Sequence, residues 1–130
     1  LLTQTKIADY IVVKKKADYL LTVKDNQPTL KQDIEALGLN SKKPDFQTTN
    51  KGHGRLEIRK IWCSTELNGY LKFPHVGQVY CIERDIEKLK GNSKTVETVF
   101  GITSQSPLKA DPGKVLKQNR EHWSIENKIH

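Results

Sequence analysis

The sequence predicts a mixed α/β fold, of the α+β kind if the chain is a fragment, in which an antiparallel β-rich segment interrupts two pieces of α/β structure. Apolar residues at helical spacing occur near both ends of the 130-residue chain, whereas residues 46–104 form short apolar runs separated by turn sequences. A chain of this length typically buries about two-thirds of its unfolded surface, which is enough for one modest core. We therefore divide the chain into residues 1–43, 44–105 and 106–130.

The first segment predicts a helix, a strand and a second helix. Residues 3–16 have apolar side chains at mostly helical spacing and end in three lysines. Residues 19–23 form a short apolar run with the length and composition of a buried strand. The second helix is expected to begin at Gln27-Pro28 and to end at Gly38, because proline suits the first helical turn and glycine follows the last.

The middle segment predicts an antiparallel sheet. Its strand-like runs are residues 56–62, 76–82 and 95–102. Turn sequences that contain glycine and asparagine or lysine lie at residues 51–55, 67–70 and 90–94. Connections as short as these join antiparallel neighbours, because parallel strands need long crossovers.

The last segment predicts a helix with a carboxylate inside its apolar stripe. Ser106-Pro107 ends the preceding strand, and Asp111-Pro112 is a helix-start sequence. At about 100° per residue, one face of residues 114–130 carries Val115, Leu116, Asn119, His122, Trp123, Glu126, Ile129 and His130.

Glu126 is the most informative residue on this face. A free charge within an apolar stripe is costly unless it is paired or bound to a cation. Glu126 could form a buried structural pair with His122, one turn earlier, or with a basic residue from elsewhere. It could instead be a ligand of a divalent metal, since Mg²⁺ prefers oxygen ligands. The helix by itself leaves both interpretations open.

The chain is basic, with 22 Lys and Arg against 15 Asp and Glu and a formal charge of +7. This balance favours a polyanionic partner, nucleic acid first, although an ordinary basic surface gives the same count. No apolar run approaches the roughly 18 residues that a membrane span needs, so we expect a cytosolic protein. Methionine is absent and the last residues stop inside a helical pattern, so we expect both ends to be cut from a longer chain.

Cys63 and Cys81 are expected to be buried, reduced thiols, because they lie in apolar runs without a CxxC spacing. A four-ligand zinc site that adds His53 and His75 is conceivable. No pair among these four residues has the short spacing typical of zinc ligands, so we favour the thiols.

Several separated motifs resemble one protein family. Residues 119–128, NREHWSIENK, preceded by Ala-Asp-Pro at residues 110–112, resemble the end of the catalytic region of H-repeat-associated insertion-sequence transposases, within the DDE transposase superfamily. Upstream motifs resemble the same family in the same order: ADYLL at 17–21, KDNQ at 24–27, KGHGR at 51–55 and STELN at 64–68. The resemblance spans essentially the whole chain.

The resemblance implies a partial RNase H-like core that is interrupted by the β-rich insertion and ends in the helix carrying the catalytic glutamate, here Glu126. In such enzymes Asp, Asp and Glu hold Mg²⁺ or Mn²⁺ for cutting and joining DNA strands. Glu126 would therefore be a catalytic residue and a metal ligand. Both aspartates are expected upstream of Leu1, so the fragment should be inactive alone. Asp25 is the best internal substitute, although a turn or helix-cap role suits it better.

The same resemblance implies DNA as the partner, namely the terminal inverted repeats of an insertion sequence and its target DNA. The intact enzyme would act in the bacterial cytoplasm and could be a homodimer. Asn119 and His122 stand where the wider group has a tyrosine and an arginine, and both can still bond phosphate. The residues expected to contact DNA are Lys51, His53, Arg55, Arg59, Arg84, Asn119, Arg120 and His122.

Two other functions fit the residues. One is a non-catalytic basic DNA-binding module left by truncation, which would keep the cations but use no carboxylate chemistry. The other is a small cytosolic interaction domain that needs no metal, which would be favoured if Glu126 were locked in a salt bridge.

Overall fold

The structure, a computed structural model, describes residues 2–25, 27–91 and 93–129, and the side chains of residues 4–25, 27–91 and 93–121. The helices are α1 (Leu2–Val13), α2 (Pro28–Glu35) and α3 (Pro112–Ile129), with a short 3₁₀ turn, η1 (Leu39–Ser41). The strands are β1 (Leu20–Val23), β2 (Phe46–Gly52), β3 (Arg55–Ser64), β4 (Gln78–Lys88) and β5 (Lys94–Thr103). The described chain is therefore an α+β structure, as the sequence predicted.

Local sequence explains where the helices begin and end. α2 begins at Pro28, whose missing N–H costs nothing in the first turn, and ends at Glu35. Gly38, which lies between α2 and η1, has a φ of 60°. Asp111 caps α3, because its Oδ1 accepts a hydrogen bond from the Lys114 backbone N–H at 2.8 Å. The start signals at both prolines are thus confirmed.

The five strands form one antiparallel sheet in the order β1-β5-β4-β3-β2. β1 comes from the first predicted segment, yet it pairs with β5 from the second, with Leu20 opposite Thr103. The remaining pairs join strands that follow one another in the chain. Residues 1–43 and 44–105 therefore contribute to a single sheet.

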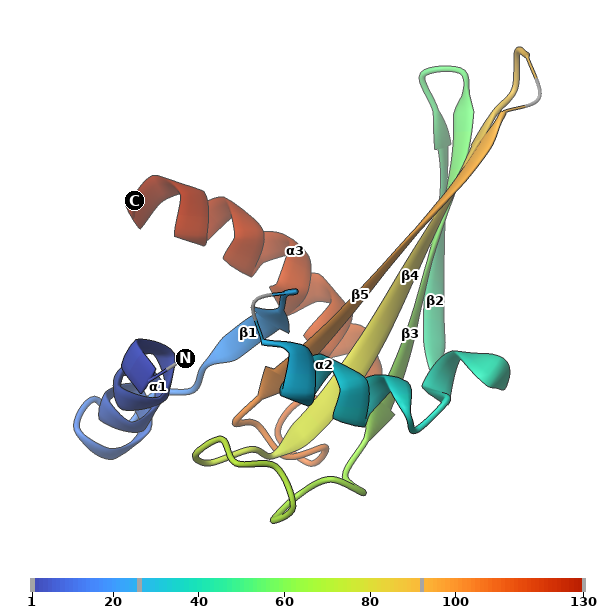
Figure 1. The fold of residues 1–130 in the computed structure, drawn as a ribbon. Coiled ribbons are helices and arrows are strands. Elements are labelled where there is room, and N and C mark those ends of the chain that lie inside the picture. Colours follow the sequence, from blue (N-terminus) through green and yellow to red (C-terminus); the bar gives the residue numbers. More distant parts are fainter. Residues whose placement is uncertain (1, 26, 92, 130) are drawn as a thin grey trace.

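Helices cover both faces of the sheet near β1 (Figure 1), so this part of the molecule has three layers. α3 lies on one face, over a core of Leu20, Ile61, Tyr80, Ile82, Ala110, Val115 and Leu116. α2 and part of α1 lie on the opposite face, over a core of Ala8, Tyr19, Val23, Leu30, Ile34, Leu39, Trp62, Leu71, Phe73, Val79, Cys81 and Ile102. Along β1, β3, β4 and β5, side chains alternate between the two cores.

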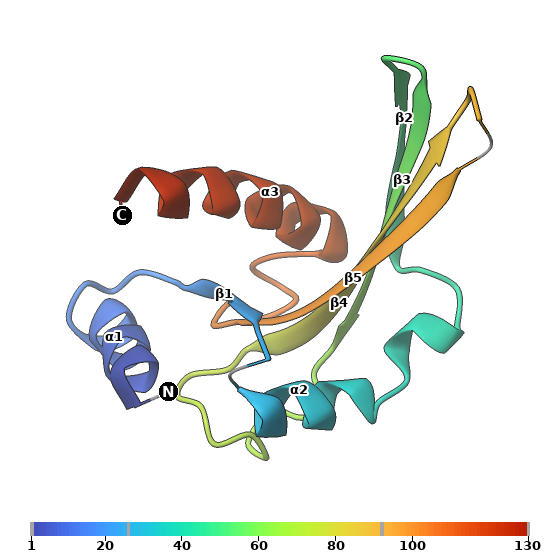
Figure 2. The same ribbon diagram turned by 45° about the horizontal axis from the view of Figure 1, so that its top comes forward.

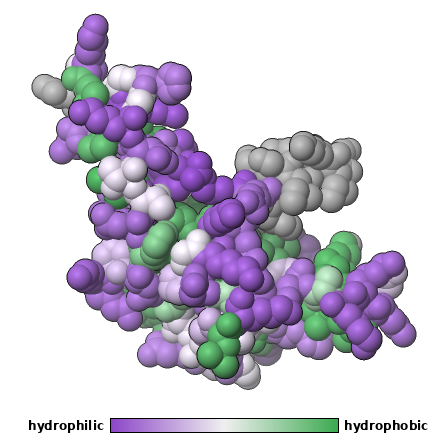
Figure 3. All heavy atoms as spheres, turned by 180° about the vertical axis from the view of Figure 1, so that it is seen from behind, coloured by the Kyte–Doolittle hydropathy of each residue, from purple (hydrophilic) through white to green (hydrophobic). Residues whose placement is uncertain are grey.

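Strands β2 to β5 continue beyond the helices as a projecting arm (Figure 2). We call residues 46–60 and 83–99 the arm, and residues 20–23, 61–64, 78–82 and 100–103 the base. Burial changes at this border: the first five residues of β4 are buried and the following ones are half-buried. Seen from behind, the projecting end is mainly hydrophilic (Figure 3). The arm is therefore a sheet with little cover on either face.

α3 crosses one face of the base, runs away from the arm, and packs on β1, β2 and β3. Its C-terminal turns extend past β1 in both ribbon views (Figure 1). β1 is the edge strand on this side of the described sheet. The helix predicted to carry the site thus runs from the root of the arm to the open edge of the sheet.

Candidate nucleic-acid interface

Glu57 of β3 is the centre of a charged cluster on the face of the arm that looks toward α3. Strand alternation and the antiparallel register place Arg55 and Arg59 on the same face as Glu57, and Arg84 of β4 directly opposite Arg59. Glu57 is only 8% exposed. Its Oε1 accepts a hydrogen bond from Arg84 Nε at 2.7 Å and forms an ion pair with Arg59 Nη2 at 2.6 Å, and its Oε2 lies 3.7 Å from Arg55 Nη2.

Cations outnumber carboxylates in this cluster. Arg84 Nη1 also donates to Glu97 Oε2 at 3.2 Å, and Arg120 of α3 lies near enough to repel Arg59. We call Arg55, Arg59, Arg84 and Arg120 the arginine cluster. Three guanidinium groups of the arm therefore pair with two carboxylates, Glu57 and Glu97, and Arg120 adds a fourth cation nearby.

The pKa of Glu57 reflects these neighbours. The hydrogen bond from Arg84 lowers the pKa of this carboxyl below its usual value, and the charges of Arg59, Arg84 and Arg55 lower it further, against the opposing effect of burial. The pKa of Arg59 is also lowered, first by burial and then by the charge of Arg120, although Glu57 opposes the shift. Glu57 is thus held in its charged form, while repulsion among the arginines remains.

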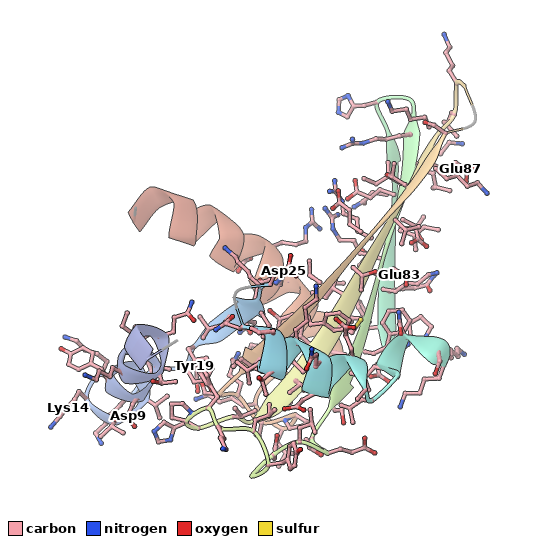
Figure 4. All side chains as sticks on the ribbon, in the orientation of Figure 1. Asp9, Lys14, Tyr19, Asp25, Glu83 and Glu87 are labelled. Carbon is pink, nitrogen blue, oxygen red and sulfur yellow. The ribbon has the colours of Figure 1, made fainter. Side chains whose placement is uncertain are left out.

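The other face of the arm has a balanced charge. Its cations are Lys51, Lys60 and Lys94, and its carboxylates are Glu83, Asp85 and Glu87, according to the register. Lys60 Nζ lies 3.1 Å from Asp85 Oδ2 and 3.9 Å from Glu83 Oε1. Glu83 and Glu87 point away from α3 (Figure 4). Lys60 therefore lies on the opposite face of the arm from Arg59 and Arg84.

The KGHGR motif forms the tip of the β2–β3 hairpin, as predicted. His53 and Gly54 are the two turn residues, with φ values of 53° and 73°, the positive pair that a type I′ turn requires. Both are exposed. Lys51 lies on the face of the arm away from the arginine cluster, so the motif contributes only Arg55 to that cluster.

Asn119 has a structural partner within the protein. Its Nδ2 donates to Tyr80 Oη at 3.2 Å, and that hydroxyl donates to the Leu21 carbonyl at 3.3 Å. Gly101 makes room for this link, because a Cβ at position 101 would lie 2.1 Å from the Tyr80 ring. α3 is thereby tied to β4 and, through Tyr80, to β1. Gln105 and Gln118 add a reciprocal amide pair at 2.6 and 3.1 Å.

The remaining predicted site residues are dispersed or lie outside the described residues. The side chains of His122 and Glu126 lie outside the described residues. Asp25 is 92% exposed and pairs with Lys31 at 2.7 Å, which suits the turn role. Among the described residues, no three His, Cys, Asp or Glu side chains group as metal ligands.

The zinc interpretation fails on geometry. Cys63 packs in the core under α3 and Cys81 in the core under α2, so the two thiols are on opposite faces of the sheet. His53 is at the arm tip, and His75 Nε2 lies 2.7 Å from Asp9 Oδ1. Both cysteines are free, and burial raises the pKa of both thiols to about 12, so both are protonated at neutral pH.

The organising role of Glu57 was missing from the sequence interpretation. The signal was present, since Arg55, Glu57 and Arg59 alternate within a predicted strand and must share a face. Arg84 could be added only when the β3–β4 register was known. Arg120 could be added only when the position of α3 was known.

Comparisons of this chain with protein-family models, with curated proteins and with solved structures found no match. Among the described residues, no helix is long and apolar enough to cross a membrane.

Proposed function

We propose that this chain is a fragment of a DDE-type transposase of the H-repeat-associated insertion-sequence family, and that the intact enzyme cuts and joins DNA strands during transposition. One observation carries the proposal. The arginine cluster lies on the face of the sheet that α3 covers, so the cations suited to DNA and the helix expected to supply the catalytic carboxylate share one side of the molecule. The ordered motifs along the chain support the family assignment.

Glu126 is the proposed third catalytic carboxylate. Helical periodicity groups position 126 with Val115 and Asn119, and both of those face the sheet: Val115 is fully buried and Asn119 bonds Tyr80. The C-terminal turns of α3 reach past the edge strand β1, which is the side where additional strands of an RNase H-like core would stand (Figure 2). Such strands would bring the two aspartates that complete the triad.

The proposed reaction uses Mg²⁺ or Mn²⁺, which would activate water and then a DNA 3′ hydroxyl and stabilise the leaving oxygen. The described residues supply no complete set of metal ligands. Their contribution is to bind and orient: the arginine cluster would hold backbone phosphates of the terminal repeat or of target DNA beside α3. The fragment alone should therefore bind DNA without cutting it. A cytoplasmic location in a bacterium follows from this proposal.

The test is strand cleavage of terminal-repeat DNA by the intact enzyme in Mg²⁺ or Mn²⁺. Glu126→Gln should abolish cleavage and leave DNA affinity unchanged, because the amide keeps the size of the side chain but not its charge. Glu121→Gln is the matched control, since Glu121 is exposed on the same helix. The control should cut normally. Normal cleavage by the Glu126→Gln enzyme would remove this residue from the site and overturn the proposal.

The arginine cluster also favours a second candidate, a basic DNA-binding module without catalysis. This function predicts that the intact protein binds duplex DNA but releases no cut strand in Mg²⁺ or Mn²⁺. It also predicts that neither Glu126→Gln nor Glu121→Gln changes this result. The cleavage assay therefore separates the two candidates directly.

A further inference from the structure

The pairing of Arg59 with Arg84 across two strands is unfavourable by itself. Like charges directly opposite each other in an antiparallel pair destabilise a sheet. Both guanidinium groups are also partly withdrawn from water, with side-chain exposures of 16% for Arg59 and 29% for Arg84. An arrangement that costs stability persists where another group compensates it, and Glu57 is that group.

Glu57 compensates the pair only in part. One oxygen, Oε1, makes the short contacts with both arginines, a hydrogen bond from Arg84 and an ion pair with Arg59. Within the described part of the chain, Glu57 is the one carboxylate that pairs with Arg59, whereas Arg84 also reaches Glu97. Each guanidinium has five N–H donors, so both retain donors for a further acceptor. Arg120 adds a nearby cation from α3, which forms no ion pair with a carboxylate among the described side chains.

We infer that Glu57 is a positioning residue that holds Arg59 and Arg84 as a preformed clamp for a backbone phosphate of duplex DNA, on the face of the sheet that α3 covers. The identity of the partner as DNA rests on the proposed function. A phosphate suits the arrangement because guanidinium forks bind its oxygens in parallel pairs. Holding the forks in advance lowers the side-chain entropy lost on binding.

A positioning role for Glu57 and overall electrostatics predict opposite effects of Glu57→Gln on DNA affinity. Glu57→Gln removes one negative charge from a protein that binds a polyanion, so overall electrostatics predicts equal or tighter binding. A positioning role predicts the reverse, because the neutral amide holds two guanidinium groups less firmly than a carboxylate does. We expect the affinity of Glu57→Gln for duplex DNA to fall about fivefold or more, equivalent to roughly 1 kcal/mol.

Glu87→Gln is the matched control. It makes the same change of charge on the same strand pair, but on the face of the arm away from α3. Binding of a short duplex is measured by fluorescence anisotropy on the intact protein, in EDTA so that no strand is cut, across a range of salt concentrations. Glu87→Gln should bind as tightly as the unaltered protein or slightly tighter.

Arg84→Lys gives an independent readout if Glu57→Gln disturbs folding. Lysine keeps the charge but loses the forked guanidinium group. A clamp therefore predicts weaker DNA binding by this variant, whereas a role as a simple point charge predicts unchanged binding. Circular dichroism and thermal melting report the fold of each variant. Unchanged binding by a folded Glu57→Gln or Arg84→Lys protein overturns the clamp while leaving the proposed enzyme intact. Absence of duplex binding by the unaltered protein, or tighter binding of duplex RNA, overturns the clamp and the DNA partner together.

Discussion

The base and the arm are made by the same strands but differ in what their side chains do. In the base, neighbours such as Ile61 and Trp62 are buried on opposite faces, each under helices. A few residues along the same strand, Glu57 and Arg59 form a charged centre on one face, while Lys60 joins carboxylates on the other. Burial of apolar area, about 25 cal/mol per Å², makes the base the main source of stability. The arm contributes less to stability, so its strands can carry charged side chains for binding.

The largest difference should appear between two glycine substitutions. Gly101→Ala in the base would place a Cβ against the Tyr80 ring, whereas Gly52→Ala in the arm meets no atom within 4 Å. We expect Gly101→Ala to lower the free energy of unfolding by about 3 kcal/mol, as overpacking does. Gly52→Ala should change it by less than about 0.5 kcal/mol. Urea unfolding of both variants measures this, and equal effects would contradict the division into base and arm.

An intermediate effect should appear as a pH dependence confined to the arm. The pKa of Glu57 is lower in the folded protein than its usual value of 4.5, so its stabilisation is fully present above pH 4.5. That stabilisation is lost as the pH falls through the lowered pKa. Amide hydrogen exchange in the arm is measured for the unaltered protein and for Glu57→Gln between pH 6 and 3. The arm of the unaltered protein should be better protected than that of the variant at pH 6, and this difference should disappear toward pH 3. An advantage that grows with acidity would show that Glu57 is not the stabilising charge.

The smallest effect should come from the arm tip. His53 adopts a positive φ that L-residues with bulky side chains rarely adopt, and the following residue is glycine. His53→Asn creates the Asn-Gly pair preferred in type I′ turns, so we expect stabilisation of about 0.5 kcal/mol. Thermal melting checks this. DNA affinity of the same variant tests the predicted contact of His53, because loss of affinity in a more stable protein would place the imidazole at the DNA.

Much of the local structure could be predicted because it depends on neighbours in the sequence. Pro28 and Asp111 mark helix starts, and the His53-Gly54 turn follows from the residues that tolerate positive φ. The strand limits were less predictable. β4 continues to Lys88 through alternating charged residues, because hydrogen bonds to both neighbouring strands hold it where no apolar run marks it.

The candidate site was predictable only in part. Arg55, Arg59, Arg84 and Arg120 were each expected to contact DNA, but their grouping around Glu57 was not foreseen. The sequence could not separate Lys60 from these arginines before the sheet register was known. It also could not show that Asn119 bonds Tyr80, because that contact joins residues far apart in the chain.

The sequence by itself determined the order of the helices and strands other than β2, the turns and caps, the excess of cations and the amphipathic character of the final helix, since each depends on residues within a few positions of one another. Only the tertiary structure decided that β1 pairs with β5, which cations share a face and that α3 lies beside them. Those features come from contacts between distant segments, and a shift of one residue in strand register would exchange the two faces of the arm. The position of Glu57 among the arginines is therefore a property of the fold as a whole.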